Sequence, residues 1–161
     1  MLEAEGDRAI QKHERNSDLQ MLDTLRRHAK EATSRWHGSN DRRRRSRAED
    51  GVKPVDLPYL RRFTQGDFAL EDEVLRLFLK HAPQYLAALR AAGTAKAWHD
   101  AAHTLKGASR GIGAWRVARC AEGAERLRFD TDLDRRAFAL DSATEALDEA
   151  VGYIHVVLRS R

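Results

Sequence analysis

Cysteine and proline are scarce in this sequence of 161 residues, which contains one cysteine, Cys120, and three prolines. A single cysteine excludes an internal disulfide framework and any zinc site built from several cysteines. No apolar run approaches the ~20 residues needed to cross a bilayer. Residues 1–18 also lack an apolar segment behind a basic start, which argues against a secretory signal. We therefore expect a cytoplasmic protein that does not associate with membranes.

The sequence also lacks the glycine-rich loops that hold nucleotide phosphates. It contains no GxxxxGK(S/T) loop, no GxGxxG loop and no kinase catalytic signature. The short run Gly111 to Gly113 does not meet either pattern. We therefore expect no ATP-dependent kinase activity.

Charge divides the chain into three parts. Charged residues make up 34% of the sequence and the net charge is +4. Residues 37–53 are polar and include the run Arg42–Arg45, so we predict a flexible basic linker there. Residues 1–36 form an N-terminal extension, for which leucines at helical spacing predict one amphipathic helix. Residues 54–161 have dense apolar periodicity and form the predicted domain.

Every periodic segment of residues 54–161 is helical in pattern. Asp56, Asp67 and Thr94 are placed to cap three helices, and two further helices are expected over 114–129 and from Leu133 to the C-terminal region. The connections are short. The sequence therefore predicts an all-α fold, an antiparallel up-down four-helix bundle preceded by a short helix. The side chains that we expect in its core include Phe78, Trp98, Cys120 and Phe138.

A histidine in the third predicted helix lies outside its apolar stripe. In the segment "AAHTLKGASRGIGA", residues 101–114, this stripe is formed by Trp98, Ala101, Leu105, Ala108 and Ile112. His103 lies on the opposite face at ~100° per residue, so we expect it to face solvent. The residues expected to share its exposed face are His99, Lys106, Gly107 and Arg110.

This pattern suits a histidine that is phosphorylated. A neutral imidazole is a nucleophile near pH 7, and Lys106 and Arg110 can neutralise the charge of a phosphoryl group. Gly107 leaves room for a partner to approach the ring, although glycine inside a helix costs ~1 kcal/mol relative to alanine. His99 and His103 are also spaced to clamp a metal ion, but a zinc site needs a third ligand and their face offers only cations. We therefore expect no metal here, and a rim position for His99.

The segment "HTLKGAS" resembles the signature of histidine-containing phosphotransfer (Hpt) domains, the relay modules of two-component phosphorelays. The resemblance covers residues 54–161 and includes "GIGA" after the histidine helix and Glu125 in the next helix. It implies that His103 accepts a phosphoryl group, that Lys106 stabilises it, and that Gly107, with His99 and Arg110, belongs to the docking surface. Taken alone, Glu125 is more simply a solvated or bridging carboxylate.

The resemblance also implies the partners. Receiver domains of response regulators and a hybrid or partner histidine kinase would exchange the phosphoryl group with this chain, and the receiver would supply Mg²⁺. No cofactor is expected in the chain itself, and an exposed accepting histidine needs no dimer partner, so we expect a monomer. Two alternatives stay open: nucleic-acid binding through Arg42–Arg45, which lacks interleaved aromatic residues, and an adaptor bundle that is not phosphorylated.

Overall fold

The computed structural model describes residues 53–161, and these residues form five helices and no strand. The all-helical prediction is confirmed for this part of the chain. The expectations for residues 1–36 and for the linker, including Arg42–Arg45, lie outside the described residues. None of the helices between residues 53 and 161 has the length and apolarity of a membrane-spanning segment. The helices are α3 (Leu57–Thr64), α4 (Phe68–Arg90), α5 (Ala95–Gly111), α6 (Trp115–Glu125) and α7 (Leu133–Arg159).

The first three of these helices begin at the side chains that the sequence indicates. Asp56, Asp67 and Thr94 each accept a hydrogen bond from a backbone N–H of the following first turn, which otherwise has no partner inside the helix. Between α3 and α4 the chain turns through Gln65 and Gly66, whose φ angles are 54° and 83°. These predicted starts are confirmed because capping depends only on residues near in sequence.

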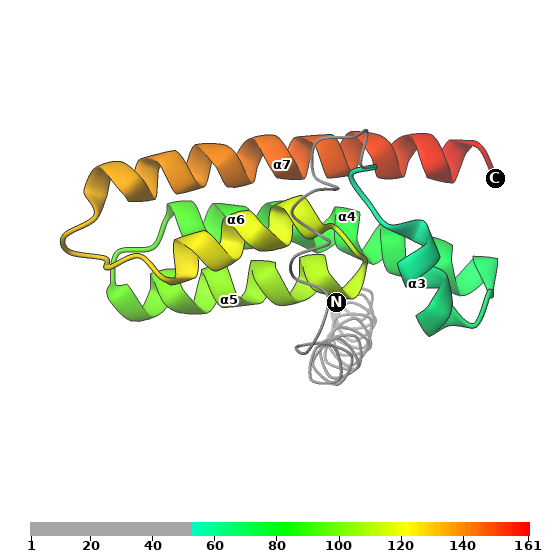
Figure 1. Ribbon diagram of the computed structural model, residues 1–161, viewed down its shortest axis with the longest axis horizontal. Coiled ribbons are helices and arrows are strands. Elements are labelled where there is room, and N and C mark those ends of the chain that lie inside the picture. The colour runs from blue at the N-terminus through cyan, green and yellow to red at the C-terminus, as the bar shows by residue number, and fades with distance from the viewer. Residues whose placement is uncertain (1–52) are drawn as a thin grey trace, which may run out of the picture.

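Helices α4 to α7 lie along the long axis of the molecule, and each runs opposite in direction to the one before it (Figure 1). Helix α5 packs between α4 and α6, and α7 contacts both α4 and α6. The short α3 lies against α4 at the end of the molecule where α7 finishes (Figure 1). The largest apolar cluster takes buried side chains from all five helices, including Leu60, Leu75, Leu105, Val117 and Ile154.

Two predictions about the last two helices are wrong. Helix α6 ends at Glu125, four residues before the predicted end, and Leu127 and Phe129 then pack on a second apolar cluster around Trp98 without being helical. Phe138, predicted in the core, is 74% exposed. It lies nine residues before buried Leu147, which is about two and a half helical turns and so places it on the opposite face. By contrast, Phe78 and Trp98 are buried as predicted, and Cys120 is half-buried against the core.

The turn between α5 and α6 depends on Gly113. Its φ angle is 77°, and a Cβ atom added there would lie 3.0 Å from Cβ of Asp56 and 3.1 Å from Cδ1 of Tyr59. The backbone N–H of Asp56 also donates to the carbonyl of Gly113 at 3.1 Å. A residue with a side chain would therefore be strained in backbone and crowded by the start of α3. This close approach fixes where α6 begins, at Trp115.

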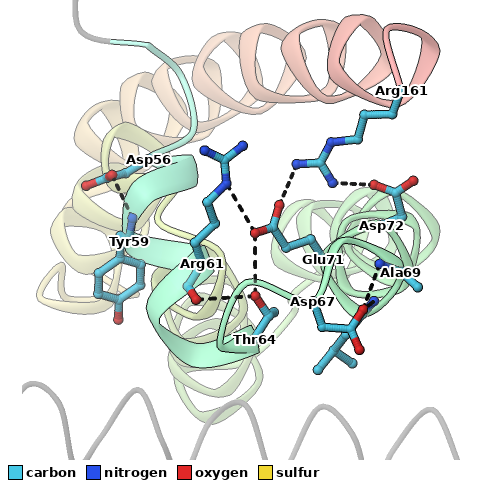
Figure 2. A network of polar contacts seen from close by, with 10 residues as sticks. Asp56, Tyr59, Arg61, Thr64, Asp67, Ala69, Glu71, Asp72 and Arg161 are labelled. Carbon is cyan, nitrogen blue, oxygen red and sulfur yellow. Dashed lines mark hydrogen bonds and ion pairs between the residues drawn. The ribbon is translucent and has the colours of Figure 1, made fainter.

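A buried carboxylate links α3 and α4 to Arg161, which follows α7. Glu71 of α4 is fully buried, and its Oε1 lies 3.3 Å from Nε of Arg61 and accepts a hydrogen bond from the Thr64 hydroxyl at 3.5 Å. Its Oε2 pairs with Arg161, which also reaches Asp72 at 2.5 Å (Figure 2). A buried charge requires such partners, and here they tie the end of α7 to α3 and α4.

Candidate functional site

His103 lies on the outer face of α5. Its side chain is 66% exposed, while Trp98 and Leu105 of the same helix are buried. The predicted outward placement of His103 is therefore confirmed. This follows from the helix period, because the apolar stripe of α5 must face the bundle and leaves the histidine opposite to it.

The ring of His103 contacts a carboxylate from the neighbouring helix. Nδ1 of His103 lies 2.7 Å from Oε1 of Glu125, the last residue of α6. Oε2 of the same carboxylate accepts a hydrogen bond from Nζ of Lys106. Glu125 is 12% exposed and thus connects the histidine and the lysine from a largely buried position.

The charge of Glu125 is stabilised by these two partners. Burial by itself would raise the pKa of this carboxyl group, but the hydrogen bonds from Lys106 and His103 together outweigh burial and lower the pKa below its usual value. Glu125 therefore stays ionised in neutral solution, with Lys106 as the compensating charge.

Lys106 is not the exposed side chain that we expected. Its side chain is only 15% exposed and is directed to Glu125. The reason is the close packing of α5 on α6, which covers one side of the face that carries His103. Buried Trp98 contributes to this packing, since its Nε1–H donates to the carbonyl of Ala124 at 2.7 Å. Lys106 and Glu125 thus form a largely buried ion pair beneath the histidine.

His99 lies one helical turn before His103. Its side chain is 58% exposed, and its ring stacks on that of His103 with centroids 6.2 Å apart and an interplanar angle of 24°. Nε2 of His99 lies 3.9 Å from Oε1 of Glu125. The expectation that only cations lie near the two histidines is wrong, because a second helix contributes the carboxylate.

The other two residues of the predicted face are less closely involved. Arg110 pairs with Glu122 of α6, with NH2 and Oε2 3.4 Å apart, and so is not joined to the cluster around His103. Gly107 lies within α5 and is half-buried rather than fully exposed. The structure thus brings together His99, His103 and Lys106 and adds Glu125 to them.

Glu125 is the residue of this cluster that the sequence pattern undervalued. The sequence spacing does indicate that Glu125 lies near His103. Ala114 lies in the turn between α5 and α6, and His103 and Glu125 are each eleven residues from it, one on either side. In an antiparallel pair of helices with equal rise per residue, such positions lie at the same height. The signal locates the residue along the helices but does not show that its side chain points to the histidine.

The arrangement defines which nitrogen of His103 can react. A carboxylate can only accept a hydrogen bond, so Nδ1 of the neutral ring carries the hydrogen and donates it to Glu125. The lone pair is then on Nε2 of an exposed side chain. An exposed nucleophilic nitrogen beside an ammonium group suits an attack on an anionic electrophile brought by another molecule.

A family model described as Hpt domain matches residues 73–152 of the chain. This range begins in α4 and extends into α7, and it includes every residue of the cluster around His103. No curated protein and no solved structure matches the chain.

Proposed function

Because this chain is an Hpt domain protein, of the class that transfers phosphoryl groups through a histidine in two-component phosphorelays, we propose that His103 is its phosphoryl carrier. In this proposal His103 accepts the group from a phosphorylated aspartate of one receiver domain and passes it to an aspartate of another. A hybrid or partner histidine kinase supplies the phosphoryl group to the relay. The chain acts as a carrier and has no kinase activity of its own.

The observation that carries the proposal is the 2.7 Å contact between Nδ1 of His103 and Oε1 of Glu125. It keeps the lone pair on Nε2, the nitrogen that would attack phosphorus. As the N–P bond forms, the bond from phosphorus to the aspartyl oxygen breaks and leaves a free carboxylate on the receiver. The ring gains positive charge during this step, and the carboxylate of Glu125 stabilises that charge through the Nδ1–H group.

Lys106 supports the reaction through its ammonium group, first by pairing with Glu125 and then by binding the attached phosphoryl group. In the unphosphorylated chain its ammonium group pairs with Glu125 and holds the carboxylate in place. Once a phosphoryl group of nearly two negative charges is attached to His103, the same ammonium group can form charge-assisted hydrogen bonds to it. Mg²⁺ belongs to the receiver in this scheme, and the chain needs no bound cofactor.

The surface around His103 would receive the partner. Gly107 has no side chain one turn after the histidine, so a receiver can bring its aspartyl phosphate close to Nε2. His99 and Arg110 would border this docking surface. We also propose that the protein is cytoplasmic and that residues 54–161 form an antiparallel up-down bundle. We propose a monomer because α5 and α6 of one chain supply every residue of the cluster.

The test is phosphoryl transfer from purified receiver domains. Receivers charged with a small acyl phosphate in the presence of Mg²⁺ are mixed with the full chain, and acid-labile, base-stable phosphate on the chain is measured. We expect labelling of the wild type and of His155→Gln, a matched control at an exposed position of α7. We expect no labelling of His103→Gln. ATP alone should give no label. Labelling that persists in His103→Gln would disprove the assignment.

A further inference from the structure

Three potential metal ligands meet on the exposed side of α5 and α6. One nitrogen of His99, one nitrogen of His103 and one carboxylate oxygen of Glu125 all lie within 4.8 Å of one another. Among residues 53–161 no other trio of histidine, cysteine or acidic side chains is grouped in this way. We propose that these three side chains bind a divalent transition-metal ion such as Zn²⁺, and that the bound ion prevents His103 from accepting a phosphoryl group.

The spacing of the ligands suits a tetrahedral ion. Two atoms bound tetrahedrally at about 2.1 Å from zinc lie about 3.4 Å apart. Oε1 of Glu125 lies 2.7 Å from Nδ1 of His103 and 3.9 Å from Nε2 of His99, so these distances bracket the required value. Histidines four residues apart on one helix are a common zinc-binding pair, and here their rings are already nearly parallel. Small side-chain rotations would complete the geometry.

The chemistry of the site also suits zinc. Two imidazoles and one carboxylate are a ligand set that zinc uses in open sites, with water in the fourth position. Lys106 bonds to Oε2 of Glu125 and leaves Oε1 for the metal, while it holds the carboxylate in the orientation that faces the histidines. The side chains of His99 and His103 are 58% and 66% exposed, so an ion can reach them from solvent.

Metal binding and phosphorylation compete for His103. If the ion binds Nδ1, the hydrogen of the neutral ring moves to Nε2, which then has no lone pair with which to attack phosphorus. If the ion binds Nε2, the reactive nitrogen is itself occupied. In both cases the ring is not a nucleophile, so the ion acts as an inhibitor and not as a cofactor. This second half of the proposal rests on the function proposed above for His103.

Metal affinity tests the site directly. The full chain is titrated with Zn²⁺ against a chromogenic zinc chelator, without any receiver domain. We expect one site in the wild type, bound at least ~10-fold more weakly by His99→Gln and by Glu125→Gln. Two matched controls, His155→Gln and Glu122→Gln, remove a histidine and a carboxylate outside the trio and should bind as the wild type does. Equal affinity in the wild type and in all four variants would overturn the proposed site.

Inhibition is measured separately with phosphoramidate, a small phosphoryl donor to imidazole that needs no receiver domain. The rate of His103 phosphorylation with Zn²⁺ is divided by the rate of the same protein without it. We expect a marked decrease for the wild type and for His155→Gln, and a much smaller one for His99→Gln. Zinc binding without this decrease would overturn the inhibition alone. Failure to bind zinc would overturn the metal site but not the proposed function of His103, which the transfer assay with receiver domains and Mg²⁺ tests independently.

Discussion

Replacing Glu125 with glutamine tests the centre of the proposed mechanism. The amide keeps an oxygen that can accept the hydrogen bond from Nδ1 of His103, but it removes the charge that compensates Lys106. Hydrogen bonds to charged groups contribute about 1.5–3 kcal/mol when buried, and exposed ion pairs contribute about 0–1 kcal/mol. Glu125 and Lys106 are 12% and 15% exposed, so the contribution of this ion pair to stability should lie between these two ranges. We expect Glu125→Gln to lower the free energy of unfolding by about 1–2 kcal/mol.

The same substitution should slow phosphoryl transfer more than it destabilises the fold. The glutamine leaves the lone pair on Nε2 but no longer stabilises the positive charge that develops on the ring. Because the ring is largely exposed and water screens part of this effect, we expect a decrease of about 10- to 100-fold in the rate of transfer from a phosphorylated receiver. Rapid-quench measurement gives the rate, and urea unfolding gives the stability. Glu149→Gln, which alters an exposed carboxylate of α7 that pairs with Arg116 and not with the cluster around His103, is the control that should transfer at the wild-type rate.

The effect of pH on stability has a defined sign. The folded-state pKa of Glu125 is lowered by Lys106 and His103 in spite of burial. Its contribution to stability is therefore fully present above the ordinary glutamate pKa and is lost as the pH falls through the folded-state value. The stability difference between the wild type and Glu125→Gln should be constant near neutrality and decrease in acid. A wild-type transfer rate in Glu125→Gln, or a stability difference that grows in acid, would refute this reasoning.

Three further substitutions address the neighbouring residues. Gly113→Ala should lower the free energy of unfolding, measured by thermal unfolding, by roughly 2–5 kcal/mol, because of left-handed backbone strain and the contacts with Asp56. Gly152→Ala, where the added methyl group meets open space, should raise it by up to ~1 kcal/mol. Equal effects of the two substitutions would contradict the tight turn at Gly113. Lys106→Ala should slow transfer and shorten the phosphohistidine lifetime, and unchanged kinetics would show that the lysine only balances Glu125. Gly107→Trp should keep its helical circular dichroism and lose about 100-fold in transfer rate, with Gly152→Trp as the control; unfolding of Gly107→Trp would instead assign the glycine to helix packing.

The sequence predicts the features of this domain that depend on nearby residues. Asp56 and Thr94 cap helices as expected because capping involves only the following turn. His103 is exposed as expected because the helix period places it opposite the apolar stripe. The prediction for Phe138 is wrong because an apolar residue on a helix need not face the bundle, and the spacing from buried Leu147 places Phe138 on the opposite face.

The ion pair of the site depends instead on packing between helices. Lys106 has an exposed position on an isolated helix, and only the contact of α5 with α6 buries it against Glu125. Sequence periodicity gives the face of each helix but not the side chains that meet across two helices, so this link could not be predicted.

The hydrogen bond from Trp98 to Ala124 places a fluorescent side chain where its emission can report on phosphorylation of His103. The indole is 1% exposed, and its N–H group bonds to the carbonyl of the residue that precedes Glu125. Attachment of a phosphoryl group adds about −1.5 to −2 charges beside that carboxylate, and the excited state of an indole responds to nearby charge. In a chain with Trp36 and Trp115 replaced by phenylalanine, the emission of Trp98 would therefore follow the loading of His103 in real time, without a radioactive label.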